Sequence, residues 1–353
     1  MNRIDKLQAR RLDPRVSNAK LLNEVYRSMQ QSDGVRYAIG AMQPIDSDYT
    51  ANTFEQGLRI QKSIADDQYV QSCEFKFQGS TTNNTHIKAA SDIDLVVLTQ
   101  KFTWLKAPLQ PPRPYTGDTK VEMKSLRDQC IDNIRSNFPA VVIDDSGGKA
   151  VKLSGGSLTR NVDLVPAGWL DTQESQALGD DYRGIEIIDR NSGENCSNFP
   201  WIHNLRVEEK DSRCLGGLRR AARLMKSLKA DSDQKVMLSS YDIASIAYNI
   251  PDAHLSFQPP LELSILDSCR NYCVSLKRDQ LARDTISVPN GTRTVFCAVG
   301  ASVEQLDNMI RELEQLITDI ARDVQRPFIR LAEARIEHPF VPARPLGPTL
   351  LAR

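Results

Sequence analysis

The segment Asp92–Thr99, DIDLVVLT, places two acidic side chains at the start of an otherwise apolar run rich in β-branched residues. Such a run predicts a buried β-strand. Because successive side chains of a strand alternate between its faces, Asp92 and Asp94 point the same way. Two neighbouring carboxylates raise each other's pKa unless a divalent, oxygen-preferring cation lies between them. The segment indicates a metal site on a central strand, although a solvated strand face gives the same pattern.

A turn before this strand has the composition of a phosphate-binding loop. Apolar and polar residues alternate over residues 72–77, which predicts a strand, and the alternation ends at Gly79 and Ser80. Glycine lets a ligand approach the backbone, and the serine hydroxyl and nearby amides can bind phosphate oxygens. Taken alone, this pair of residues would fit any turn.

A third acidic residue, Asp163, lies inside the apolar segment Asn161–Val165, which also predicts a strand. An unpaired carboxylate in apolar surroundings is energetically costly. If this strand neighbours the one that carries Asp92 and Asp94, a shared metal would compensate its charge. A salt bridge to Arg160 or to another cation is the structural alternative.

The remaining pattern divides the chain into a mixed α/β part and a helical part, and therefore predicts an α+β fold. We expect an N-terminal helical extension over residues 1–50, a catalytic core over 51–200, a helical lobe over 201–326 and a flexible, basic, Pro-rich tail over 327–353. Helices are predicted over about residues 18–31, 53–69, 118–137, 215–229, 239–249, 260–281 and 302–325, and further strands over 141–143, 151–153 and 185–189.

One helix of the second part is strongly basic. The sequence LRRAARLMKSLK, from Leu218 to Lys229, has five cations and no acid, and Arg219, Arg223 and Lys226 fall on one flank. Such a local patch suits a triphosphate, whereas a solvated basic face is the alternative.

Composition limits the classes of partner. The chain has 353 residues with 45 Lys and Arg against 45 Asp and Glu, and this neutral balance disfavours strong binding to long nucleic acids. The charged N-terminus and the lack of a long apolar run predict a cytoplasmic protein without a membrane segment. Seven Cys without a C-x-x-C pair suit a reducing compartment, and we expect Cys269 and Cys273 to pack in a core rather than to bind zinc.

The G-S turn, the D-x-D strand and the later Asp together resemble the DNA polymerase β-like nucleotidyltransferase fold, in its template-independent branch. The segments RLMKSL, from Arg223, and LSSY, ending at Tyr241, resemble the K-L-M-K and S-S-Y segments of cyclic GMP-AMP synthase and its bacterial relatives, the CD-NTases of antiphage signalling. The resemblance extends from Glu74 to Asn249. It lacks the zinc ribbon with which the animal enzyme binds DNA.

This resemblance implies a Mg²⁺-dependent enzyme that joins ribonucleoside triphosphates, ATP and GTP among them, into a cyclic oligonucleotide messenger and releases pyrophosphate. A cyclic dinucleotide is expected before a trinucleotide, in antiphage (CBASS) defence. The enzyme is expected to be a monomer, and a regulatory protein could dock on its tail. Two Mg²⁺ ions, for which Mn²⁺ could substitute, would be held by Asp92, Asp94 and Asp163; the nucleotide-binding residues would be Gly79, Ser80, Lys226, Ser240 and Tyr241, with Lys226 and Ser240 on the triphosphate and Tyr241 stacked on a base.

Three other functions share parts of this pattern. An RNA-terminal enzyme that adds CCA or poly(A) has the same turn and carboxylates, but the neutral charge weighs against it. An antibiotic adenylyltransferase would not need the Lys226 and Ser240–Tyr241 arrangement. A pseudo-enzyme that only binds nucleotides is disfavoured by the intact carboxylates.

Overall fold

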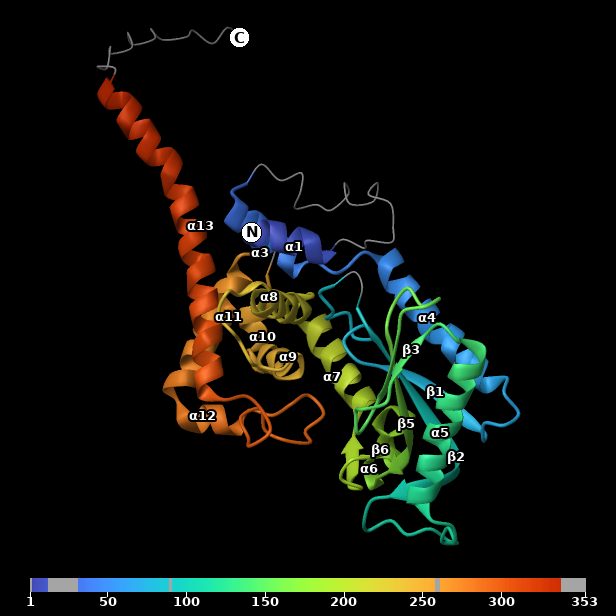
Figure 1. The fold of residues 1–353 in the computed structure, drawn as a ribbon. Helices are drawn as coiled ribbons and strands as arrows, with labels where there is room; N and C mark the ends of the chain where they lie inside the picture. The colour runs from blue at the N-terminus through green and yellow to red at the C-terminus, as the bar shows by residue number, and fades with distance from the viewer. Residues whose placement is uncertain (1, 12–30, 89–90, 258–260, 338–353) are drawn as a thin grey trace, which may run out of the picture.

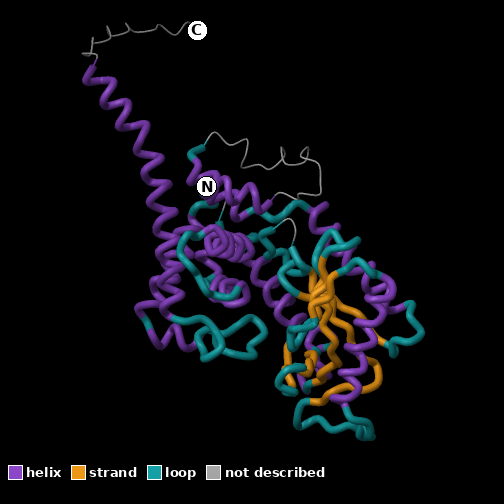
Figure 2. The backbone as a smooth tube through the Cα atoms, in the orientation of Figure 1, coloured by secondary structure: helices purple, strands orange, loops and turns teal. Residues whose placement is uncertain are grey.

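The computed structural model describes residues 2–11, 31–88, 91–257 and 261–337, with side chains described as far as residue 323. A β-sheet with its covering helices forms one lobe, and a group of helices forms the other (Figures 1 and 2). The predicted α+β fold class is confirmed. The helix predicted over about residues 18–31 falls almost wholly on 12–30, outside the described residues.

The sheet has seven strands and is mixed. Five strands are hydrogen-bonded in the order β1-β2-β5-β4-β3. Strand β6 pairs with the C-terminal half of β5, and β7 pairs with β6. The pair β2–β5 is parallel, and the other pairs are antiparallel. The bounds are β1 (Cys73–Gln78), β2 (Ile93–Leu105), β3 (Val142–Asp144), β4 (Val151–Ser154), β5 (Val162–Asp171), β6 (Gly184–Ile188) and β7 (Asn195–Asn198).

The two strands that carry the acidic residues are longer than the sequence predicted. The predicted strand ends at Val165, just before Pro166. The strand instead continues through Pro166, since its second half is buried and pairs with β2 on one side and β6 on the other. The long parallel pairing holds the starts of β2 and β5 side by side.

Helices α4 (Ser47–Ala65) and α5 (Thr119–Asn137) cover one face of the sheet. Ile60 and Ile64 of α4 and Leu126 of α5 belong to the same buried cluster as Ile93 and Leu95 of β2. The Asp118 side chain caps α5 by accepting hydrogen bonds from two backbone amides, which explains why the predicted boundary is accurate.

The second lobe is helical, and residues from the beginning of the chain complete its core. Ile4, Leu7, Tyr37 and Met42 are buried in one cluster with the apolar stripe of α8 (Gly217–Asp231). Cys269 and Cys273 are wholly buried in that cluster. The helices outside the sheet's α4–α5 face are α1 (Arg3–Arg11), α3 (Asp33–Met42), α6 (Gln173–Leu178), α7 (Pro200–Arg213), α8 (Gly217–Asp231), α9 (Ser240–Asn249), α10 (Asp252–Leu255), α11 (Ser264–Arg278), α12 (Gln280–Thr285) and α13 (Val303–Glu337).

Several helices differ from the prediction, and α4, for example, spans Ser47–Ala65 rather than about residues 53–69. Helix α7 was not predicted, because several positions on its buried side are polar, among them His203, Lys210 and Asp211. Helix α13 continues past Pro327 to Glu337, although the tail was expected to begin at Pro327. The helical spacing of apolar residues continues in the sequence beyond this proline, and the rest of the expected tail, residues 338–353, lies outside the described residues. Within the described residues, no helix is both long and apolar enough to cross a bilayer.

Candidate active site

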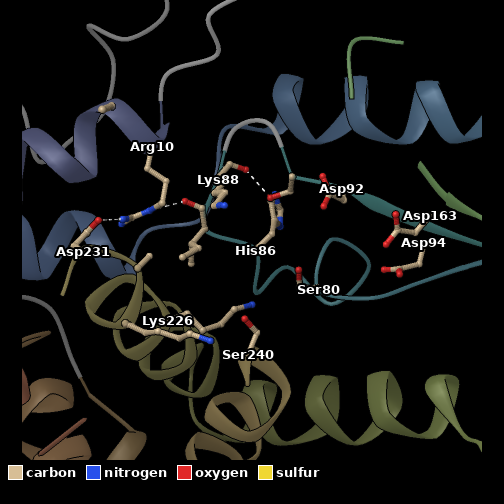
Figure 3. A pocket seen from close by; sticks show the side chains of 15 residues that line it. Arg10, Ser80, His86, Lys88, Asp92, Asp94, Asp163, Lys226, Asp231 and Ser240 are labelled. Atoms are coloured by element: carbon tan, nitrogen blue, oxygen red, sulfur yellow. Dashed lines mark hydrogen bonds and ion pairs between the residues drawn. The ribbon is translucent and has the colours of Figure 1, made fainter. Parts of the chain in front are cut away.

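The three predicted carboxylates lie together where the parallel strands β2 and β5 begin. Asp94 and Asp163 are partners in the register of this pair, and Asp92 directly precedes β2. All three line one cavity of about 920 Å³, and Figure 3 shows the side chains of Asp94 and Asp163 next to each other. Asp92 is exposed, whereas Asp94 and Asp163 are half-buried.

Asp94 and Asp163 are each harder to ionise than an ordinary carboxylate. Burial, together with the charges of Asp163 and Asp92, raises the pKa of Asp94 to about 7. Burial and Asp92 also raise the pKa of Asp163, which Lys152 partly offsets. The cation that acts on Asp163 is Lys152, its partner on β4, which falls within the predicted alternative of Arg160 or another cation. A divalent cation would remove this repulsion.

The donor set suits an ion that takes part of its coordination from a substrate. In the described part of the chain, no three His, Cys, Asp or Glu side chains are grouped as a complete metal site. Mg²⁺ is commonly held by one or two carboxylates together with phosphate oxygens and water, not by an all-protein cage. The chemistry of Asp92, Asp94 and Asp163 therefore fits Mg²⁺ shared with a triphosphate.

The turn after β1 packs directly against this acidic group. Gly79 has a φ of +93°, and a Cβ atom at this position would lie 2.1 Å from Oδ2 of Asp94. The Thr81 hydroxyl donates to the backbone oxygen of Asp92, at 3.2 Å, which ties the turn to β2. Ser80 lines the large cavity and also a second one of about 320 Å³.

The basic flank of α8 differs from the sequence hypothesis. Its three predicted cations bind three successive backbone oxygens of the loop after Ser80, and of these three Lys226 lines the two cavities whereas Arg219 and Arg223 do not. Arg219 in addition pairs with Asp211 and Glu208. The contacts are Arg219 Nε to Asn83 O at 2.8 Å, Arg223 Nη1 to Asn84 O at 2.6 Å and Lys226 Nζ to Thr85 O at 2.6 Å.

Lys226 and Ser240 lie between the two cavities and line both of them. Lys226 is buried, and burial, helped by the charges of Arg223 and Lys229, lowers its pKa to about 8. Ser240 is the first residue of α9, and Ser239 caps that helix by accepting from the amide of Asp242. Both side chains can reach a ligand that spans the two cavities.

Tyr241 lines the second cavity and is already packed against other side chains. Its ring stacks on the imidazole of His203, with centroids 5.1 Å apart and planes at 28°, and the Arg293 guanidinium lies 5.5 Å from its centroid. Its hydroxyl donates to Oδ1 of Asn290 at 3.1 Å. No sequence pattern pointed to His203, because α7 was not predicted.

The large cavity also contains residues that sequence reasoning missed. They come from α1, from the loop before β2 and from the end of α8, which meet only in the folded chain. These residues are Ala9, Arg10, His86, Ile87, Lys88, Ser91, Lys229, Ala230 and Asp231.

Comparison with known proteins decides the family. No family model matches the sequence. The chain is 34% identical over 309 residues to the cyclic dinucleotide synthase CdnE of Yersinia aleksiciae, which covers 86% of this chain and 81% of that protein. The chain belongs to the CD-NTase family. The predicted family and nucleotidyltransferase class are thereby confirmed.

Other CD-NTases agree in sequence and fold. A c-di-GMP synthase of a Lachnospiraceae bacterium, strain RUG226, is 30% identical over 285 residues, which cover 72% of this CD-NTase and 80% of that protein. The solved STING-associated CdnE c-di-GMP synthase of Capnocytophaga granulosa has a TM-score of 0.76 at 24% identity and covers 91% of this chain and 98% of its own. The Rhodothermus marinus CdnE c-UMP-AMP synthase, solved with Apcpp and Upnpp, has a TM-score of 0.63 at 18% identity, covering 79% and 94%.

Proposed function

We propose that this CD-NTase condenses two ribonucleoside triphosphates into a cyclic dinucleotide with release of two pyrophosphates. The observation that carries the proposal is the position of Asp94 on the boundary between two adjoining cavities, together with Ser80, Lys226 and Ser240. Two connected cavities can hold two nucleotides, and the acidic group lies where these would meet.

We assign the donor nucleotide to the cavity of about 320 Å³. Gly79, Ser80, Lys226 and Ser240 would bind its triphosphate, because they offer close backbone approach, hydroxyl groups and a cation. Tyr241 is the base-stacking residue in this proposal. The base would stack on its ring either beside His203 or in the position that the His203 ring takes here. Stacking on an aromatic ring tolerates different bases.

We assign the acceptor nucleotide to the cavity of about 920 Å³, which contains Asp163. Its ribose hydroxyl would lie beside Asp163, whose carboxylate can orient the hydroxyl and accept its proton. The hydroxyl oxygen forms the bond to the α-phosphorus as the bond to pyrophosphate breaks. The same step on the linear product closes the ring.

Asp92, Asp94 and Asp163 would hold two Mg²⁺ ions, or Mn²⁺ in their place. When bound, these ions would neutralise triphosphate charge and make the attacking hydroxyl more acidic. The side chains of this protein contribute the rest: Asp163 orients the hydroxyl and accepts its proton, and Lys226 and Ser240 stabilise charge on the departing pyrophosphate.

Guanine is our first candidate for the base. Three relatives are named c-di-GMP synthases, at 30%, 31% and 23% identity. We also propose that the product acts as a messenger in antiphage defence, under control of a protein partner. A CdnC of Escherichia coli, 14% identical with a TM-score of 0.52, has been solved in complex with HORMA-deltaN.

The test is product analysis by mass spectrometry. The protein is incubated with the four ribonucleoside triphosphates and Mg²⁺, with and without an RNA primer, and products are treated with phosphatase. A small phosphatase-resistant product without RNA supports the proposal, and it should disappear in an Asp92→Asn, Asp94→Asn double variant that retains the thermal unfolding transition. RNA extension alone would favour the RNA-terminal alternative, and turnover by the double variant would refute the site.

A further inference from the structure

The large cavity has opposite charges at its two ends. Figure 3 shows Asp94 and Asp163 at one end and Arg10, beside Asp231, at the other. Lys88 and Lys229 also line this cavity. We propose that Arg10, Lys88 and Lys229 form an anion-binding subsite for the 5′-phosphates of the acceptor nucleotide. The inference rests on the proposed function and extends it to helix α1.

Arg10 is built into this end of the cavity and has one unused donor. Its side chain is 7% exposed, its Nη1 pairs with the Asp231 carboxylate, and its Nε donates to Ile87 O at 3.1 Å. Its Nη2 is buried and has no hydrogen-bond partner. A buried charged donor without an acceptor is costly, and a phosphate oxygen is the acceptor that guanidinium groups bind best.

The surrounding contacts hold this guanidinium in place. The Tyr37 hydroxyl donates to Oδ2 of Asp231 at 2.8 Å, and Lys6 Nζ donates to the Asp231 backbone oxygen, also at 2.8 Å. Asp231 therefore orients Arg10 and balances its charge. The two lysines leave this end of the cavity positive: Lys88 is exposed, and Lys229 donates to the Leu238 backbone oxygen.

The separation of charge orients the acceptor. A triphosphate is strongly repelled by Asp92, Asp94 and Asp163 unless it shares their metal ions, and the donor triphosphate takes that position. The acceptor phosphates would then point towards Arg10, which leaves the ribose hydroxyl facing Asp163. Helix α1 would thus select acceptors that carry 5′-phosphates.

Acceptor use can be measured apart from donor use. The donor is 2′,3′-dideoxy-GTP, which has no attacking hydroxyl. The acceptors are guanosine, GMP and α,β-methylene-GTP, none of which can donate, so each reaction stops at a linear dinucleotide. If product analysis shows adenine, the adenosine series replaces these compounds.

The expected result is a change in acceptor preference. Wild-type protein should use α,β-methylene-GTP with a higher kcat/KM than guanosine. Arg10→Gln should reduce the ratio of kcat/KM for α,β-methylene-GTP to kcat/KM for guanosine by about tenfold, as expected for one charge-assisted hydrogen bond. The kcat/KM for guanosine itself should stay nearly unchanged. Lys88→Gln, at an exposed position, should reduce the ratio by about threefold.

Matched variants separate binding from folding. Arg3→Gln removes another α1 cation, one that pairs with Glu312 and does not line this cavity, and should leave the ratio unchanged. Lys120→Gln is the exposed control for Lys88. If Arg10→Gln unfolds, the Arg10→Gln, Asp231→Asn double variant removes both charges and takes its place.

Two failures are distinguishable. If Arg10→Gln lowers kcat/KM equally for all three acceptors, or leaves the ratio unchanged, the phosphate subsite is wrong while the proposed function stands. If wild-type protein makes no dinucleotide with any acceptor, the proposed function itself fails.

Discussion

A Cβ atom at position 79 would lie 2.1 Å from Oδ2 of Asp94, so the turn after β1 can approach the acidic group only through a glycine. The φ of +93° at Gly79 disfavours other residues independently of this contact. The same residue thus permits the turn and leaves the carboxylate in place.

Gly79→Ala should consequently impair activity more than stability. We expect strain of about 1–3 kcal/mol from the backbone conformation and, because Asp94 must move, a loss of kcat of about a hundredfold. Steady-state pyrophosphate release and urea unfolding measure the two effects. Gly155→Ala is the control, since Gly155 also has a positive φ, of +71°, but has nothing within 4 Å of its Cβ position. Equal kinetic defects in both variants would contradict the role of the contact.

Asp94 should make the metal-free protein less stable as pH rises. Its pKa of about 7 in the folded state lies above the ordinary value of 3.8, so between these values the folded chain binds more protons than the unfolded chain. The free energy of unfolding contributed by Asp94 is therefore greatest below about pH 4 and is lost as pH rises through about 7. Thermal unfolding in EDTA from pH 4 to pH 8 should show this decline.

Asp94→Asn should flatten that decline and should raise the Tm in EDTA at neutral pH, because it removes the repulsion from Asp163 and Asp92. Asp118→Asn, at the exposed cap of α5, is the control for an ordinary acid-to-amide change. A steep decline that survives in Asp94→Asn would show that Asp94 is not its source.

Arg223 should stabilise the loop after Ser80 rather than bind nucleotide directly. It is buried and donates to the backbone oxygens of Met42 and Asn84, and burial lowers its pKa to about 9. Arg223→Met leaves both oxygens without this donor, which should cost about 1–3 kcal/mol and raise the KM for the triphosphate with a smaller effect on kcat.

Urea unfolding and steady-state kinetics separate these effects, with Arg220→Met as the α8 control. Arg220 lies over the Phe257 ring and bonds the Gly216 backbone oxygen, so its loss should leave the KM unchanged. A drop in kcat with no change in KM or stability for Arg223→Met would contradict the loop-holding role.

The sequence predicted the parts of the site whose signal is local. Asp92 and Asp94 are two residues apart at the start of β2, and strand periodicity predicted that they point the same way. Asp163 was recognisable because an acid interrupts an apolar run. These positions depend on strand periodicity, which the sheet preserves.

The parts that sequence reasoning missed depend on tertiary contacts. Arg219 and Arg223 have the same pattern as a free basic face, and only the loop carbonyls that they meet reveal a structural role. Arg10 comes from a charged N-terminal helix more than 200 positions before Asp231, and no local pattern links them. His203 lies on α7, which was not predicted because several residues on its buried side are polar.

Tyr241 provides the sharpest test of the donor assignment. Its ring stacks on His203, and its hydroxyl bonds Asn290, so two variants separate the two contacts. Tyr241→Phe keeps the ring and should change the donor KM by less than about threefold. Tyr241→Ala removes the ring and should raise the donor KM by about ten- to a hundredfold, because base stacking contributes about 1–3 kcal/mol.

The KM for the donor alone is measured at saturating acceptor, by competition with a dideoxy nucleotide that acts as donor and cannot act as acceptor. Tyr272→Ala, at a partly buried ring of the helical lobe away from both cavities, controls for lost packing. An unchanged donor KM in Tyr241→Ala would show that the base does not stack on Tyr241, because loss of the ring would then leave the binding of the donor nucleotide unaffected.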